Sequence, residues 1–184
     1  MTMVFKKHKE KIALKMKEKF NYNSDLAVPK IEKIVVNIGV GKLSQQPNFD
    51  KNLEFILNDI SLITGQKPAL TAAKKSIAGF KIRANQTVGL KTTLRRLKMH
   101  DFLQRLINVV FPRTKDFRGI SVNNIDNSGN LNIGIREHVV FPEISADTMK
   151  FDFGFQISIV SNAKTREEAI ELYKLSGIPL KKHG

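Results

Sequence analysis

The residues best suited to do chemistry lie between positions 60 and 100, where every charged side chain is a cation. This stretch contains nine Lys and Arg and no Asp or Glu, so it supplies +9 of the formal net charge of +14. Concentrated cations attract polyanions, because each neutralised phosphate releases condensed counterions. A charged surface that serves only solubility is less favoured, since such surfaces normally mix positive and negative side chains. We call these nine residues the cationic belt: Lys67, Lys74, Lys75, Lys81, Arg83, Lys91, Arg95, Arg96 and Lys98.

The motifs of enzymes are incomplete in this sequence. Gly39-Val40-Gly41-Lys42 lacks the first glycine and the Ser or Thr of a phosphate loop, and the third glycine of a dinucleotide fingerprint. Asp152-Phe153-Gly154 resembles a kinase triplet, but no Gly-rich or catalytic loop accompanies it, and the alternation places it inside a strand. The four histidines lack a second ligand at metal-site spacing, and Ser76 lacks a convincing His or carboxylate partner nearby in the sequence. We therefore predict a binding protein, with no catalytic residue, metal or cofactor.

Composition sets the class of protein. A chain of 184 residues with 41% hydrophobic residues can bury a substantial core. The absence of cysteine excludes a disulfide framework and a thiolate metal site. No run of 18 apolar residues is present, so no membrane span is expected, and the lysine-rich start lacks the apolar region of a secretory signal.

The N-terminal segment, residues 3–20, is predicted to be an amphipathic helix. Phe5, Ile12, Met16 and Phe20 recur about every four residues among seven lysines. A helix lying on a membrane surface is the less favoured alternative, because the apolar stripe is narrow. We divide the chain into a basic N-terminal helix, residues 1–23, and a single α+β domain, residues 24–184.

Residues 30–40 alternate with the period of a strand. Ile34, Val36, Ile38 and Val40 form an apolar set, and Asn37 belongs to the opposite, mixed set. Because Asn is depleted in strands, Asn37 is either a hydrogen-bonding group for a partner or a tolerated surface residue. The sequence leaves both possibilities open.

The remaining pattern predicts helices and hairpin-linked strands. Helices are expected from Pro47 to Gly65, over residues 99–110 with a stop at Pro112, and after a capping box at residues 165–168. Strands are expected at residues 69–74, 80–83, 90–96, 131–135 and 151–159, with a basic loop at 75–79 and turns at 84–89 and 127–130. This order predicts an α+β fold, with an antiparallel sheet, helices packed on one face and a projecting basic loop.

Several segments together resemble the large-subunit ribosomal protein five family of bacteria and organelles. The similarity covers roughly residues 24–179, in the family's order. The segments that carry it are Val36-Asn37-Ile38-Gly39-Val40-Gly41, Ile63-Thr64-Gly65-Gln66-Lys67-Pro68, Ala73-Lys74-Lys75-Ser76-Ile77-Ala78-Gly79-Phe80, Lys91-Thr92-Thr93-Leu94-Arg95, Asp116-Phe117-Arg118-Gly119 and Phe141-Pro142-Glu143-Ile144.

The resemblance implies a cytoplasmic ribosomal protein that binds 5S rRNA and seats it in the central protuberance of the large subunit. Its other implied partners are large-subunit rRNA, neighbouring 5S-binding ribosomal proteins, peptidyl-site tRNA and, across an intersubunit bridge, a small-subunit head protein. For 5S rRNA we expect contacts from Asn37, Gln66, Thr93, Lys33, Lys67, Lys91 and Arg95. For tRNA we expect contacts from Lys74, Lys75, Ser76, Ile77, Ala78, Gly79, Phe80, Lys81 and Arg83.

The chain departs from the family in two places. Relatives usually have a glycine and a proline in the turn at residues 84–88, and many have glycine where Arg96 stands. With two Tyr and no Trp, we expect base stacking to contribute little. The rival functions are a duplex nucleic-acid-binding protein without sequence preference, which lacks a visible recognition helix, and an enzyme acting on nucleic acid.

Overall fold

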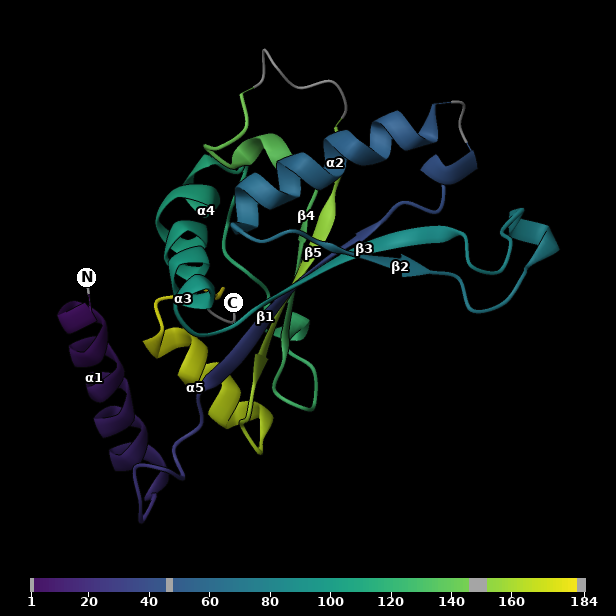
Figure 1. Ribbon diagram of the computed structural model, residues 1–184. Helices are drawn as coiled ribbons and strands as arrows, with labels where there is room; N and C mark the ends of the chain where they lie inside the picture. The colour runs from purple at the N-terminus through teal and green to yellow at the C-terminus, as the bar shows by residue number, and fades with distance from the viewer. Residues whose placement is uncertain (1, 46–47, 146–151, 182–184) are drawn as a thin grey trace. The chain divides into compact units, whose positions relative to one another are not determined.

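The computed structural model describes residues 2–45, 48–145 and 152–181. Its helices include α1 (Thr2–Phe20), α2 (Phe49–Thr64), α3 (Arg96–Arg105), α4 (Phe111–Arg113) and α5 (Arg166–Leu175). The strands are β1 (Ile31–Gly39), β2 (Ala69–Ala72), β3 (Thr87–Leu94), β4 (Leu131–Ile135) and β5 (Phe155–Ser161). They form a sheet in the order β2-β3-β1-β5-β4 (Figure 1).

The chain divides into two compact units. Unit 1 comprises Met1–Glu32, Asp116–Asn132 and Ile159–Gly184. Unit 2 comprises Lys33–Lys115 and Ile133–Ser158, and it contains the whole cationic belt. The division into a helix over residues 1–23 and a single domain over residues 24–184 stays a prediction.

In unit 2, β3 pairs with both β1 and β2, and both pairings are antiparallel. Alternate residues of a strand face opposite sides of the sheet. The core side is formed by buried residues of two strands and of α2, which packs against β3 (Figure 1): Ile34, Val36, Ile38, Leu90, Leu94, Ile56, Ile60 and Ile63. Each buried Ile or Leu contributes about 1.5–3 kcal/mol of hydrophobic stabilisation. The predicted α+β fold with an antiparallel sheet is confirmed, whereas the projection of the basic loop stays a prediction.

The strand predicted at residues 80–83 is wrong. The chain there forms a short 3₁₀ turn, Ala78–Phe80, closed by an isolated bridge between Ile77 and Ile82. The turn predicted at residues 84–89 is also partly wrong, because β3 begins at Thr87, which pairs with Ala72 across a register shift. The pairing of β3 with β2 therefore begins before residues 90–96, where the sequence pattern predicted this strand.

The third predicted helix continues beyond its expected stop. α3 passes into a π-type segment, Leu106–Val110, and then into α4, which contains Pro112. Proline cannot donate a backbone hydrogen bond. The wider turn, with the Phe111 N–H donating to Leu106 O, carries the helix past the proline, and the Thr114 N–H donates to Val110 O at 3.0 Å. Pro47 lies outside the described residues, and α2 begins after Asn48.

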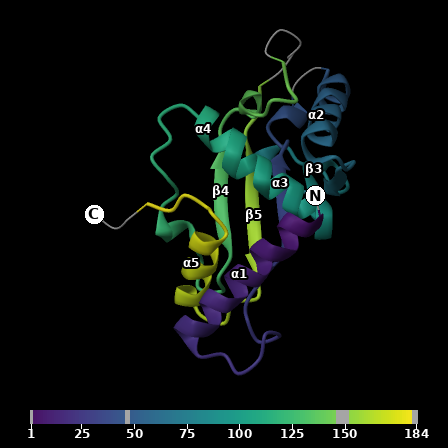
Figure 2. The same ribbon diagram turned by 90° about the vertical axis from the view of Figure 1, so that its left-hand side faces the viewer.

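Unit 1 contains the packing of α1 against α5 (Figure 2). Met16 of α1 and Leu172 of α5 are buried together with Val28. Lys19 Nζ lies 2.6 Å from Glu171 Oε2 at the edge of this contact. The predicted capping box of α5 is present, with the Thr165 side chain accepting from Glu168 N–H. Buried Met16, with partly buried Ile12 and Phe20 packed against the same cluster, thus accounts for the described part of the apolar stripe of α1.

Tyr173 anchors α5 through its buried hydroxyl, which lies 2.7 Å from Gly129 O and 3.0 Å from Ile159 O and shares its one proton between these two acceptors. Burial raises the pKa of Tyr173 to about 12, from 10.0. Because the pKa is higher in the folded than in the unfolded protein, the neutral hydroxyl stabilises the fold. This stabilisation is fully present below pH 10 and is lost as the pH rises toward 12. We expect Tyr173→Phe to lower the free energy of unfolding by about 1–2 kcal/mol at pH 7. Urea denaturation should show that this difference shrinks above pH 10, and a constant difference would contradict the assignment.

Candidate nucleic-acid interface

The cationic belt is solvent-exposed along its whole length. All nine of its residues are exposed, and Lys98 Nζ donates to Gly65 O at 2.7 Å. Within the described part of the chain, none of the nine forms an ion pair with a carboxylate. Their charges are therefore available to an external anion and are not neutralised by the protein.

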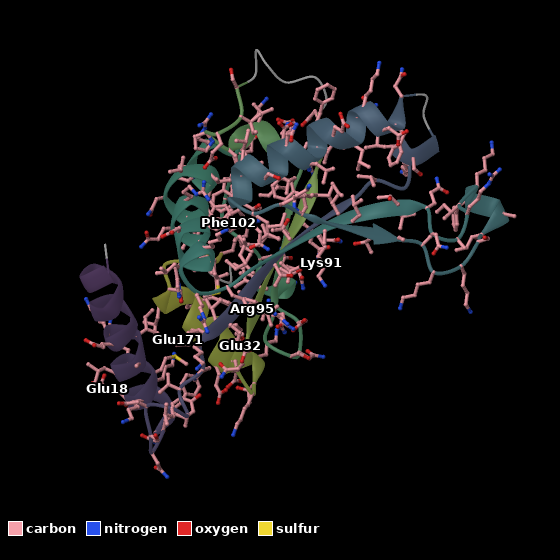
Figure 3. The ribbon with its side chains drawn as sticks, in the orientation of Figure 1. Glu18, Glu32, Lys91, Arg95, Phe102 and Glu171 are labelled. Carbon is pink, nitrogen blue, oxygen red and sulfur yellow. The ribbon has the colours of Figure 1, made fainter. Side chains whose placement is uncertain are left out.

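The face of the sheet opposite the core brings predicted site residues together. Asn37 of β1 lies directly opposite Lys91 of β3, and Lys91 is in turn paired with Ala69 of β2. Both Asn37 and Lys91 are exposed. Two residues further along β3, and so on the same face, Thr93 lies opposite Val35. An amide, an ammonium group and a hydroxyl thus lie on neighbouring strands, and Lys91 is labelled in Figure 3.

The end of α2 places a second amide beside β3. Gly65 ends the helix with a φ of 64°, and Gln66 follows it. Gln66 Nε2 lies 3.4 Å from the backbone oxygen of Thr93, so the two predicted residues are neighbours. Exposed Lys67 follows Gln66. The side chain of Gln66 is positioned by the protein before any partner binds.

Two further cations extend the same face. Lys33 precedes Val35 by two residues, and Arg95 follows Thr93 by two, so strand alternation places each on the polar side. Lys33 is half-buried and Arg95 is exposed at the end of β3 (Figure 3). We call the assembled residues the sheet-face site: Asn37, Gln66, Thr93, Lys33, Lys67, Lys91 and Arg95.

The connection between β2 and β3 holds the other predicted set, residues 74–83, and from here on the name basic loop covers this whole range. Its residues are exposed except for half-buried Ile82. Ser76 Oγ accepts from Ala84 N–H at 2.9 Å across the base of the loop. Gln86 accepts from Arg83 N–H at 2.9 Å and also donates to Ser44 Oγ at 3.0 Å. Hydrogen bonds therefore fix the stem that carries the loop.

The C-terminal end of α2 is held by cations from α3. Arg105 Nη2 donates to Ile63 O at 2.9 Å, and Arg105 also forms an ion pair with Glu143. Together with Lys98 on Gly65 O, these groups bind the orphan carbonyls of a helix end, where positive charge is favourable. This clamp sets the position from which Gln66 enters the sheet-face site.

Arg96 has an unusual backbone conformation, with a φ of 53°. The left-handed region costs about 1–2 kcal/mol for residues with a Cβ, but glycine adopts it readily. The positive φ therefore explains why relatives would have glycine at this position, as the family resemblance leads us to expect. In this chain a guanidinium stands at that position despite the backbone strain.

Replacing Arg96 with glycine should stabilise the protein. We expect Arg96→Gly to raise the free energy of unfolding by about 1 kcal/mol and the melting temperature by about 2–4 °C. Arg96→Ala is the matched control, because it removes the same charge but keeps the strained Cβ. Thermal unfolding followed by circular dichroism measures both. Equal shifts for the two variants would show that charge, and not φ, is responsible.

A buried cluster around His138 was not predicted from the sequence. The His138 ring is fully buried, with Nδ1 3.0 Å from Asp152 Oδ1 and Nε2 3.4 Å from Asp59 Oδ2. Phe153 stacks on it with ring centroids 4.1 Å apart. Burial raises the pKa of Asp59, although His138 acts in the opposite direction. The cluster joins α2 to the segment before β5, and no spacing in the sequence signals such a contact.

This cluster also corrects the interpretation of the kinase-like triplet. Asp152, Phe153 and Gly154 precede β5 and do not lie within it. In the described part of the chain, no group of three or more His, Asp or Glu side chains is arranged to hold a metal ion. No helix there is long and apolar enough to cross a bilayer. What the exposed residues can do is bind an anionic polymer and hydrogen-bond to its sugars or bases.

Comparison with known families decides the class of protein. The family described as Ribosomal protein L5 matches residues 24–83, and the C-terminal region of the same ribosomal family matches residues 87–180. The chain belongs to the ribosomal protein L5 family. The resemblance inferred from the sequence is therefore confirmed over nearly the same residues.

Individual relatives match along almost their full length. The chain is 50% identical to large ribosomal subunit protein uL5 of Halothermothrix orenii, covering 97% of this chain and 98% of that protein. It is 48% identical to the uL5 protein of Syntrophomonas wolfei, covering 98% and 100%, and 48% identical to that of Lactobacillus acidophilus, covering 94% of each. This L5-family chain is a ribosomal protein of the large subunit, a structural component and not an enzyme.

Proposed function

We propose that this L5-family protein binds 5S rRNA through the sheet-face site and helps to attach it to the large subunit in the central protuberance. The observation that carries the proposal is that three exposed cations of the acid-free cationic belt belong to the same site as Asn37, Gln66 and Thr93. Contacts with large-subunit rRNA and with neighbouring 5S-binding ribosomal proteins belong to the same proposal.

The mechanism is recognition without chemistry. Lys and Arg attract phosphates irrespective of sequence, and side-chain amides and hydroxyls supply directional hydrogen bonds. Asn37 can both donate and accept, which suits the edge of an unpaired base or a ribose 2′-OH. The strand register supports this division between phosphate attraction and directional hydrogen bonding, because Asn37 is paired across the strands with the cation Lys91 and not with another amide. A 2′-OH contact would also distinguish RNA from DNA.

The basic loop is proposed to contact peptidyl-site tRNA. Four exposed cations support this, Lys74, Lys75, Lys81 and Arg83, together with the hydrogen bonds that fix the stem. A loop that is ordered before binding loses less conformational entropy on binding. A further contact with a small-subunit head protein, across an intersubunit bridge, completes the proposal.

The two proposed RNA sites should be separable by substitution. We expect large subunits that contain the double variant Lys74→Ala, Lys75→Ala to bind tRNA about tenfold more weakly, because two charged contacts are lost. Its affinity for isolated 5S rRNA should stay within about twofold, since neither lysine belongs to the sheet-face site. Fluorescence anisotropy measures both affinities. A matched loss of both would show that the surface is divided wrongly.

Chemical footprinting of 5S rRNA, with and without the full-length chain, tests the main proposal. Protection should be confined to a structured loop region, because the deep, narrow major groove of a regular A-form helix keeps side chains from reading its bases, whereas unpaired loop bases are accessible. A competition with duplex DNA of equal length provides the control. If the DNA competes as well as unlabelled 5S rRNA, the alternative of a duplex nucleic-acid-binding protein without sequence preference is favoured.

A further inference from the structure

An apolar pair is exposed inside the basic loop, which carries four of the nine cations of the cationic belt. The Phe80 side chain is 66% exposed and that of Ile77 is 47% exposed. Both belong to the basic loop, which also carries Lys74, Lys75 and Lys81 and contains no Asp or Glu. A single exposed apolar residue needs no explanation. An exposed aromatic ring surrounded by exposed cations is a more specific combination, because it joins a stacking surface to phosphate-binding groups.

The backbone under this ring is held in place. Ile77 N–H donates to Ile82 O at 2.9 Å, and Ile82 N–H donates back to Ile77 O at 3.2 Å. Phe80 ends the 3₁₀ turn between these two residues, and its N–H donates to Ile77 O at 3.3 Å. Lys81 then takes a φ of 51°, with its N–H donating to Ala78 O at 3.0 Å. The aromatic side chain is thus presented by a closed turn, so little ordering is required when it meets a partner.

We propose that Phe80 is a stacking platform for an unpaired base of the RNA that the basic loop holds. This inference rests on the proposed function of that loop and adds the kind of nucleotide it recognises. Every nucleobase has a flat π-face, so an aromatic ring binds unpaired bases with little sequence preference. The surrounding positive charge favours a nucleic acid over an apolar protein segment. The expectation that stacking contributes little considered Tyr and Trp and overlooked Phe80.

The chain contains no tryptophan, so Phe80→Trp introduces one fluorescent reporter at the proposed site. Stacking of a base on an indole quenches its fluorescence. The full-length variant is titrated with an RNA hairpin that has an unpaired loop, and with a fully paired RNA duplex of the same length. Leu62→Trp is the matched control, because Leu62 is 59% exposed but lies on α2, outside the basic loop. Anisotropy of labelled RNA reports binding independently of quenching.

We expect the hairpin to quench Phe80→Trp much more strongly than the duplex does, and neither RNA to quench Leu62→Trp appreciably. Phe80→Leu and Phe80→Ala should each weaken hairpin binding about 5- to 100-fold, the range for loss of one stacked base, without lowering the melting temperature. Binding by Phe80→Leu equal to that of the unsubstituted chain would overturn the stacking role. Hairpin binding without quenching would do the same and leave the proposed function intact. Failure of the unsubstituted chain to bind 5S rRNA would instead overturn the proposed function.

Discussion

Replacing both Lys91 and Arg95 with glutamate should weaken the binding of 5S rRNA by at least about 100-fold at low salt. Each charge-assisted contact contributes about 1.5 kcal/mol or more, and about 1.4 kcal/mol is a factor of ten in affinity. Both side chains are exposed on the polar side of β3, without an internal carboxylate partner in the described chain. Reversal therefore removes two attractive contacts and introduces repulsion, with little direct effect on the fold.

Salt titration gives the same prediction a second measurement. If about six phosphates are engaged, log affinity should fall with log salt with a slope of about −4 to −5, and the double variant should be shallower by about 2. The control Lys51→Glu, Lys164→Glu makes the same change in net charge at exposed residues outside the sheet-face site. Its effect should be small near physiological salt, where charges separated by more than about 8 Å are screened. Salt-independent binding, or equal losses in both double variants, would refute a localised phosphate site.

Arg105→Ala should produce the largest loss of stability among the substitutions considered for unit 2. Arg105 is the shared partner of Ile63 O and Glu143, and its side chain is 33% exposed. The substitution leaves the Glu143 carboxylate, 22% exposed, without its counter-charge, and leaves a helix-end carbonyl without its donor. After allowance for partial solvent screening, we expect a loss of about 2–3 kcal/mol in the free energy of unfolding. The melting temperature should fall by about 4–10 °C.

Two control substitutions separate the geometry of this clamp from its charge. Arg105→Lys keeps the charge but loses the planar fork that reaches two acceptors, so an intermediate loss is expected. Arg113→Ala removes an exposed guanidinium from α4 and should change stability by less than about 0.5 kcal/mol. Urea denaturation at neutral pH measures all three variants. An Arg105→Ala loss no larger than that of Arg113→Ala would show that the clamp does not stabilise α2.

The elements predicted best were those in which local pattern and burial agree. Alternation at Ile34, Val36 and Ile38 predicted β1 and its core face, because a strand with one buried face must repeat every two residues. Gly65 and the Thr165–Glu168 pair marked helix ends, because caps satisfy backbone groups locally. The candidate RNA-binding residues were found from charge and family resemblance, and their roles stay proposals.

The misplaced elements depended on distant partners. Residues 80–83 have strand-like composition, yet Phe80 lies in a 3₁₀ turn because Ile77 and Ile82 close the loop across it. Pro112 was expected to stop a helix, but the π-type segment before it carries the helix to Arg113. The contacts of His138 with Asp59 and Asp152 were not predicted, because these two carboxylates reach it only through the folding of the chain.

The sequence by itself determined the fold class, the family and the concentration of positive charge in residues 60–100, since periodicity, motif order and composition are properties of the chain. Tertiary structure alone decided which of these residues are neighbours. Strand register set Asn37 opposite Lys91, and packing of the α2 end brought Gln66 to Thr93. It also decided that the ring of Phe80 is exposed whereas those of Phe102 and Phe141 are buried. Burial and pairing depend on contacts between residues far apart in the chain, and local composition does not encode those contacts.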